Sequence, residues 1–267
     1  DDIVVTKPDK GTGVVVMDES QNNKLLNEAS IDNKEKFRSV TLEWPKMRGR
    51  PPKHYHPLLQ KEKELETVVR HIHPKDVADA VCPKSSRLAH LYGLPKTHKP
   101  KLAMRPILSA TGTYNFMLAK WLDEKLKPIS TNKFTISDPL RFSEELRTKE
   151  ILDDGILVSY DVSSLFTNVP VDETIEILVQ KAFHHEWFNN SYKLALKESD
   201  LRTLLSIAVE IQLFQLDGKL YEQIDGVAMG SPLGPLMANT FMCSIEETLV
   251  KNMDMPSFYH RFVDDTI

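Results

Sequence analysis

The strongest constraint on the fold lies at the end of the sequence, where an aromatic and apolar run meets two adjacent aspartates. Residues 258–263 read Phe-Tyr-His-Arg-Phe-Val, and Asp264 and Asp265 follow directly. This pattern predicts a buried strand that ends in a tight acidic turn. Adjacent carboxylates repel each other, and a divalent cation that prefers oxygen ligands is one reason to place them together. A solvated turn is the ordinary alternative for an isolated pair.

A third carboxylate, Asp161, has matching surroundings. The apolar, β-prone residues 156–160 precede it, and the turn signal Asp153-Asp154-Gly155 precedes that run. Asp161 is therefore predicted to stand at the end of a strand. Beside the Asp264–Asp265 turn in one sheet, it would help to hold two Mg²⁺ ions for phosphoryl transfer. An aspartate that only caps the local Asp-Val-Ser-Ser turn is the alternative.

A glycine-rich segment lies between these acidic blocks. Residues 226–235 read Gly-Val-Ala-Met-Gly-Ser-Pro-Leu-Gly-Pro and lead into the long apolar segment 236–250. Ser231 is predicted as a helix N-cap, with Pro232 at the first helical position. Glycines here let a flat base or a sugar approach the backbone closely. Alone, the segment indicates the start of a helix more than a functional site.

The order of these blocks resembles that of a known family. Asp161-x-x-x-x-Phe166, then residues 229–235, then residues 262–265 resemble the A, B and C blocks of reverse transcriptases. Other segments resemble the reverse transcriptases of Penelope-like retroelements in particular: 7–18, 92–100, Arg105-Pro106-Ile107 and 161–170. The resemblance spans residues 1–267, and five blocks in the same order are specific for a polymerase. The three aspartates are intact, which argues against a decayed copy.

The resemblance implies catalytic and metal-binding residues. The catalytic carboxylates would be Asp161, Asp264 and Asp265, and the metal ligands Asp161, Val162, Asp264 and Asp265. Asp161 and Asp264 would bridge two Mg²⁺ ions, for which Mn²⁺ could substitute. Because Mg²⁺ keeps some of its water ligands, two or three carboxylates and the substrate phosphates suffice.

The resemblance also implies nucleotide-binding residues. Lys10 and Arg105 would contact the incoming triphosphate, since arginine suits bidentate phosphate contacts and lysine suits point-charge contacts. Phe166 would act as a steric gate, an aromatic ring under the sugar that excludes a 2′-hydroxyl. An ordinary core aromatic is the alternative for Phe166. Gly230 and Ser231 would line the nucleotide or template face.

Charge is distributed unevenly along the chain. The net charge of −4 divides into +8 for residues 1–133 and −12 for residues 134–267. Residues 84–105 contain no acidic residue, and their basic side chains suit a phosphate backbone or a triphosphate. The residues predicted to bind nucleic acid are Lys84, Arg87, Lys96, Lys99 and Lys101. A solvated basic face is the alternative.

Periodicity and turn signals predict an α+β fold. Hairpins are expected around residues 3–17 and at Asp217-Gly218, strands at 87–91 and 105–109, and a loop at 44–57. Helices are expected at residues 20–29, 58–72, 114–126, 139–148, 171–187 and 199–211. The resemblance implies the fingers and palm of a right-hand polymerase, with fingers in 1–150 and palm in 151–267. The palm would be an antiparallel sheet with helices packed on one face.

Other features argue for an intracellular globular protein. No apolar run approaches the ~20 residues of a membrane span, so no membrane association is expected. Cys82 and Cys243 suggest neither a disulfide framework nor a zinc site. The pairs His54/His56, His71/His73 and His184/His185 lack ligand partners at the right spacing and are interpreted as solvated. A nuclear site of action is expected from the family resemblance.

The predicted function is RNA-templated DNA synthesis by a retroelement reverse transcriptase, with an RNA template, a DNA primer and dNTPs as partners. The chain ends two residues after Asp265. We therefore expect an excised fingers-palm fragment without its thumb, and its activity by itself is left open. Two alternatives remain: a domesticated nucleic-acid-binding module without turnover, and an RNA-dependent RNA polymerase. The intact carboxylates argue against the first, and the aromatic Phe166 argues against the second.

Overall fold

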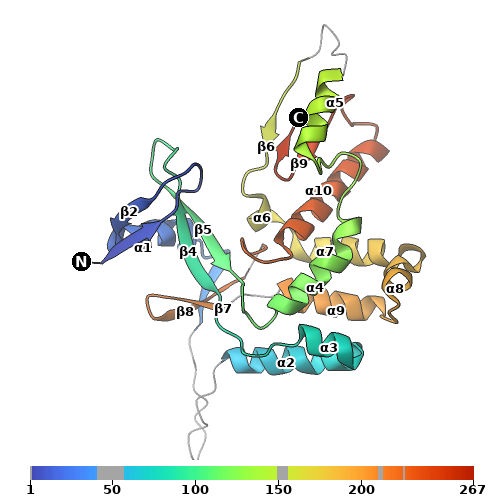
Figure 1. Cartoon of the computed structure of the whole chain (residues 1–267), viewed down its shortest axis with the longest axis horizontal. Helices are drawn as coiled ribbons and strands as arrows, with labels where there is room; N and C mark the ends of the chain where they lie inside the picture. Colours follow the sequence, from blue (N-terminus) through green and yellow to red (C-terminus); the bar gives the residue numbers. More distant parts are fainter. Residues whose placement is uncertain (1, 41–56, 149–155, 210–212, 225) are drawn as a thin grey trace, which may run out of the picture.

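A computed structural model of the protein describes residues 2–40, 57–148, 156–209, 213–224 and 226–267. Short strands and helices are mixed along the chain (Figure 1). The strands are β1 (Ile3–Thr6), β2 (Val15–Asp18), β3 (Phe37–Val40), β4 (His90–Pro95), β5 (Met104–Ser109), β6 (Tyr160–Asp161), β7 (Leu213–Leu216), β8 (Lys219–Gln223), β9 (Arg261–Phe262) and β10 (Asp265–Thr266). The α-helices are α1 (Glu19–Ala29), α2 (Pro57–Ile72), α3 (Lys75–Val81), α4 (Phe116–Leu126), α5 (Pro139–Thr148), α6 (Leu165–Asn168), α7 (Val171–Phe183), α8 (Trp187–Tyr192), α9 (Glu198–Val209) and α10 (Gly234–Lys251).

The strands of the described segments form four small sheets. Two are the pairs β1-β2 and β4-β5, and the other two have the orders β3-β8-β7 and β6-β10-β9. All the pairings between these strands are antiparallel. A parallel bridge joins Ala89, just before β4, to Phe214 on β7, where the Ala89 N–H donates to the Leu213 carbonyl at 2.9 Å. The mixed α+β fold expected from the sequence is confirmed.

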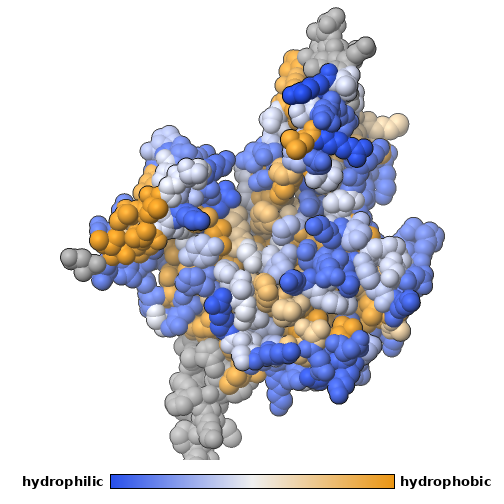
Figure 2. Space-filling model, viewed as in Figure 1, coloured by the Kyte–Doolittle hydropathy of each residue, from blue (hydrophilic) through white to orange (hydrophobic). Residues whose placement is uncertain are grey.

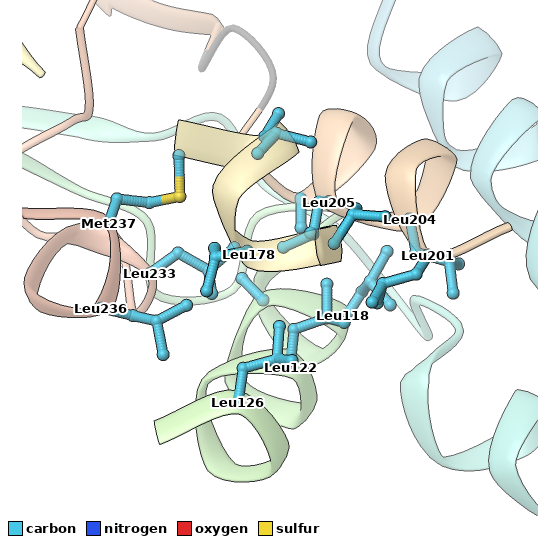
Figure 3. Close-up of a cluster of buried hydrophobic side chains, with 14 of the residues drawn as sticks. Leu118, Leu122, Leu126, Leu178, Leu201, Leu204, Leu205, Leu233, Leu236 and Met237 are labelled. Carbon is cyan, nitrogen blue, oxygen red and sulfur yellow. The ribbon is translucent and has the colours of Figure 1, made fainter. Parts of the chain in front are cut away.

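The larger hydrophobic core lies among the helices on one side of the molecule (Figures 1 and 3). On α4, Leu118, Leu122 and Leu126 recur every four residues and are fully buried. Leucines of α7, α9 and α10 converge on the same cluster in Figure 3. Burying one such side chain contributes roughly 1.5–3 kcal/mol. This core therefore holds α4, α7, α9 and α10 as one unit.

A second hydrophobic core lies beneath the sheets at the other side. It joins α1 to the strands through Leu26, Phe37, Met104, Leu108 and Phe214. The β1-β2 hairpin beside it is different, because one of its faces is apolar and uncovered. That face carries Ile3, Val5, Val14 and Val16, each more than half exposed, and Figure 2 shows the corresponding hydrophobic patch near the N-terminus.

Several predicted elements differ from the structure in their bounds. The strand expected at 87–91 is β4 and lies three residues later, because it pairs in register with β5 from His90↔Ser109 to Pro95↔Met104. The β-prone run before Asp161 contributes only two residues to a strand, since residues 156–159 are irregular. The helix expected at 171–187 is interrupted after Phe183, where His185 and Glu186 have φ values of +52° and +53°. The loop expected at 44–57 lies almost wholly outside the described residues. The division at residue 150 stays a prediction.

None of the helices in the described segments combines the length and the apolar character needed to cross a bilayer. Cys82 and Cys243 are both buried and carry free thiols.

His73 is a correction to the expectation of solvated histidines. Its side chain is buried at the end of α2, where the ring packs edge-on against Trp121 with centroids 4.9 Å apart. Neither ring nitrogen has a hydrogen-bond partner among the residues the structure describes. Burial lowers the pKa of His73 below its usual value, because the apolar surroundings disfavour the charged ring.

We expect His73 to make the protein less stable in mild acid. Since its pKa is lower in the folded state, the unfolded chain takes up the proton first as pH falls below about 6.5, and the free energy of unfolding decreases. His73→Leu should flatten this dependence between pH 7 and pH 5, measured by urea unfolding at each pH. His71, on the same helix but exposed, provides the control variant His71→Leu. An unchanged pH dependence in His73→Leu would contradict the assignment.

Candidate active site

The predicted acidic turn is present as the β9-β10 hairpin. Phe262 pairs with Asp265, which leaves Val263 and Asp264 as the two central residues of the turn. Val263 has a φ of +58°, and Asp264 is not among the residues with positive φ. A positive φ at the first central residue is typical of a tight hairpin turn. For a β-branched residue it costs roughly 1–3 kcal/mol, so contacts elsewhere must hold this conformation.

Strand β6 brings Asp161 to this hairpin, as predicted. Asp161 pairs directly with Asp265, and the Val162 N–H donates to the Asp264 carbonyl at 2.9 Å. Residues directly opposite each other in an antiparallel pair place their side chains on one face, with Cβ atoms about 4.5–5.5 Å apart. The sheet therefore brings Asp161 to the Asp264–Asp265 turn, which lies about a hundred positions later in the sequence.

The surroundings of the three carboxylates suit a cation. Asp161 and Asp265 are exposed and Asp264 is half-buried, and in the described part of the chain none of them forms an ion pair with a protein side chain. Oxygen ligands of this kind are those that Mg²⁺ prefers. Nevertheless, no three acidic, histidine or cysteine side chains among the described residues stand close enough to form a ready-made metal site. The donor set fits the predicted ions in type, and the strand register places Asp161 opposite Asp265.

A cavity of about 520 Å³ lies between β5, α4, α6 and the loop before α10. Its size is in the range of small-molecule sites. It is lined by Arg105, Ile107, Phe116, Phe166, Ala228, Met229, Gly230, Ser231, Pro232, Gly234 and Pro235. Four of the five predicted nucleotide-binding residues thus share one cavity. Lys10 is not among the lining residues and is exposed in the β1-β2 loop.

The glycines of the loop fix its distance from the strands. Gly230 has a φ of +118°, and a Cβ atom on it would lie 2.6 Å from the Leu108 carbonyl oxygen on β5. The Leu108 N–H donates to the Met229 carbonyl at 2.8 Å, so the loop lies directly on β5. At Gly234, a Cβ atom would lie 3.5 Å from the Phe166 ring. The absence of a side chain at Gly230 therefore lets the loop lie on β5, whereas a Cβ atom at Gly234 would make an ordinary contact with the ring.

The predicted N-cap of the following helix is wrong in its position. Helix α10 begins at Gly234 after Leu233, which makes no side-chain cap hydrogen bond, and the proline in the first turn is Pro235 instead of Pro232. Ser231 instead accepts a weak hydrogen bond on Oγ from the Leu233 N–H at 3.4 Å. The helix thus begins two residues later than predicted, beyond the tight contact of Gly230 with β5.

Sequence reasoning did not assign a role to Asp9, which is the partner of Arg105. The Arg105 Nε lies 2.8 Å from Asp9 Oδ1, and the Asp9 side chain is only 4% exposed. The Asp9 N–H also donates to the Pro95 carbonyl at 2.9 Å, which fixes the β1-β2 loop against β4. The only indication of this ion pair in the sequence was that Asp9 is an acidic residue between two basic ones, Lys7 and Lys10. Asp9 thereby holds Arg105 where it lines the cavity.

The basic residues predicted to bind nucleic acid fall into two groups. Lys84 and Arg87 precede β4, whereas Lys96, Lys99 and Lys101 follow its end in the β4-β5 turn. Six strand residues separate the groups, about 20 Å at the rise of a β-strand. The Arg87 side chain donates through Nε to the Thr111 carbonyl at 2.7 Å. The local patch predicted from the sequence is thus two surfaces, one at each end of β4.

A buried ion pair behind the hairpin was also missed. Arg261 is fully buried, and its Nε lies 2.6 Å from Oε1 of Glu246, which is 1% exposed. Tyr259 donates its hydroxyl to the same Glu246 oxygen at 3.1 Å. Burial and, next, the Glu246 charge raise the pKa of Tyr259 to about 12. The sequence contained one indication of this pair, because Arg261 is a charged residue inside an apolar run. Charged side chains are almost never fully buried unless they are paired.

Comparison with known sequences identifies one family. The family described as "Reverse transcriptase (RNA-dependent DNA polymerase)" matches residues 95–267, which contain the cavity and all three aspartates. No curated protein sequence matches the chain.

Solved structures with a similar fold include telomerases of Candida tropicalis. Apo telomerase truncated from its C-terminal domain is 12% identical with a TM-score of 0.52, and the match covers 98% of this chain and 51% of that one. Telomerase in complex with the TWJ fragment of telomeric RNA is 11% identical with a TM-score of 0.56, covering 98% of this chain and 42% of that one. Apo telomerase is 11% identical with a TM-score of 0.53, and the match covers 98% of this chain and 46% of that one. The chain thus spans about half the length of these proteins, with which it shares the fold.

Proposed function

The chain belongs to the reverse transcriptase family, and we propose that it provides the fingers and palm of an RNA-templated DNA polymerase of a Penelope-like retroelement. A reverse-transcriptase-type polymerase is what the family match and the telomerase-like fold support. The retroelement assignment rests on the sequence blocks at 7–18, 92–100 and 161–170. An intracellular, nuclear site of action is proposed on the same resemblance.

The observation that carries the proposal is the strand register at the hairpin. Asp161 and Asp265 are directly opposed, and Asp264 is in the adjoining turn, joined to β6 by the Val162 N–H. These residues would hold two Mg²⁺ ions, with Mn²⁺ as a substitute. When bound, the metals would activate the primer 3′-hydroxyl and stabilise the leaving pyrophosphate.

The cavity supplies the second part of the proposal, a place for the nucleotide. Arg105, oriented by Asp9, would bind the triphosphate, and Lys10, adjacent to Asp9 in the sequence, would add a point charge. Phe166 would lie under the sugar. Phe166 is five residues from Asp161, so the two residues are at most about 18 Å apart along an extended chain.

RNA and DNA would be bound by the basic surfaces at the two ends of β4. One of the similar structures is a telomerase in complex with an RNA fragment, which supports an RNA template as partner here. A DNA primer and dNTPs complete the proposed set of partners.

The proposal is tested by primer extension with the full-length protein on a primed RNA template, with Mg²⁺ and either dNTPs or rNTPs. We expect extension with dNTPs. Binding of the template without extension and without Mg²⁺-dependent dNTP binding would favour the nucleic-acid-binding module. Extension with rNTPs at an equal or higher rate would favour an RNA-dependent RNA polymerase.

Phe166→Ala is expected to relax sugar selection. Removing the ring leaves room for a 2′-hydroxyl, so the preference for dNTPs over rNTPs, as a ratio of kcat/KM values, should fall by about tenfold or more. Phe116→Ala, which removes another aromatic ring of the same cavity, is the matched control. An unchanged ratio in Phe166→Ala, with normal dNTP use, would mean that Phe166 is an ordinary packing residue.

A further inference from the structure

The turn that presents Asp264 is connected to the protein interior by one side chain. The Arg261 guanidinium donates through Nη1 to the Val263 carbonyl at 3.1 Å and to Asn239 Oδ1 at 2.9 Å. Val263 is the residue whose positive φ requires external support. Arg261 is therefore in contact with the peptide that precedes the catalytic carboxylate.

Helix α10 provides the anchor for this arginine. Asn239, Cys243 and Glu246 lie on one face of α10 at spacings of four and three residues, and each contacts the Arg261 side chain. Glu246 is held in turn by Asn132 Nδ2 at 2.7 Å and by Tyr259. Because both charges are buried and fully hydrogen-bonded, the guanidinium has little freedom to move.

The backbone of Arg261 is fixed as well. On its outer edge, the Arg261 N–H donates to the Phe134 carbonyl at 2.9 Å, and the Ile136 N–H donates to the Arg261 carbonyl at 2.7 Å. The hairpin is thus clamped between β6, the segment around residue 135, and α10. Helix α10 also begins at the loop that lines the nucleotide cavity.

We propose that Arg261, charge-paired with Glu246, is a positioning residue that holds the Val263–Asp264 turn in its metal-binding geometry. This inference rests on the proposed function, because it assigns the turn a metal. A buried ion pair adds little net stability compared with apolar residues of similar size. Apolar residues could not replace the hydrogen bond that Arg261 donates to the Val263 carbonyl in the turn.

The test separates folding from positioning by using a double variant. Arg261→Met alone should unfold the protein, since it leaves the Glu246 charge buried and unpaired. Arg261→Met combined with Glu246→Leu removes both charges and should fold. The matched control is Arg202→Met with Glu176→Leu, which removes a bidentate pair on α7 and α9 with Nε–Oε1 at 2.5 Å.

Three measurements on the full-length double variant decide the inference. Hydrogen exchange should accelerate at the Val162 amide, which donates to Asp264, while the His260 and Ile267 amides at the base of the hairpin stay protected. Mn²⁺ affinity should fall by about 10–100-fold, as is usual when a residue supporting a metal ligand is lost. Primer extension should lose kcat by a similar factor with the KM for dNTP unchanged.

The outcomes are distinguishable from those of the proposed function. If the wild type extends primers and the double variant shows wild-type exchange, Mn²⁺ affinity and kcat, the positioning role is overturned and the function stands. If the wild type extends nothing, the proposed function fails, and the exchange of the Val162 amide still decides whether Arg261 holds the turn. The Arg202/Glu176 control should behave as wild type throughout.

Discussion

Replacing Asp264 with asparagine should lower the rate of primer extension by about a thousandfold while leaving template binding intact. Asparagine has the shape of aspartate but no charge, so the hairpin should keep its geometry and lose affinity for the metals. Metal stabilisation of transition-state charge contributes several kcal/mol, and each 1.36 kcal/mol is a factor of ten in rate. The measurement is single-turnover primer extension at saturating dNTP.

The control for Asp264→Asn is Asp254→Asn. Asp254 is an exposed acid just beyond α10, so it removes the same charge from the same region of the chain. We expect the Asp254 variant to extend at the wild-type rate. Equal losses in the two variants would point to net charge instead of metal binding, and an active Asp264→Asn would remove the carboxylate from the mechanism.

The strand register makes this prediction more specific. Asp161 faces Asp265 across the pair, whereas the family resemblance assigned Asp161 and Asp264 as the bridging ligands. On the family assignment, Asp161→Asn and Asp264→Asn should each be severe, and the double variant little worse than either, because residues that act as one unit are not additive. The size of the Asp265→Asn effect then reports how far Asp265 shares in the site.

The sequence predicted the elements that depend on local pattern. The apolar residues Phe116, Leu118, Trp121 and Leu122 predicted α4, and Asp217-Gly218 predicted the β7-β8 hairpin. Both signals arise within one element, where periodicity and turn chemistry act directly. Asp161 and the Asp264–Asp265 pair were predicted as site residues because each follows an apolar run. The order of the sequence blocks indicated that they belong to one site.

The features that were missed depend on partners distant in sequence. Nothing around Arg261 indicates that Glu246 on another element neutralises it, and nothing around Asp9 indicates Arg105. The burial of His73 likewise depends on Trp121 from α4. A charged or polar residue can be read as solvated or as buried and paired, and only the tertiary arrangement decides between these states.

Gly230→Ala is expected to be the most damaging single-methyl change in the cavity. The new Cβ atom would lie 2.6 Å from the Leu108 carbonyl oxygen and 3.2 Å from the Ser109 Cα, both backbone atoms that cannot rotate away. A φ of +118° adds conformational strain. Overpacking and strain each cost about 1–3 kcal/mol, so we expect a loss of roughly 3–5 kcal/mol in the free energy of unfolding.

Gly218→Ala separates the two causes. Gly218 also has a positive φ, +73°, but a Cβ atom there would meet nothing within 4 Å, so its cost should be the strain alone, about 1 kcal/mol. Denaturant unfolding of both variants measures the difference. If Gly230→Ala remains folded by moving the loop away from β5, the cavity must widen, and the KM for dNTP should rise while primer binding is unchanged. A Gly230→Ala variant as stable as Gly218→Ala, with an unchanged KM, would show that the loop does not need its contact with β5 to form the nucleotide site.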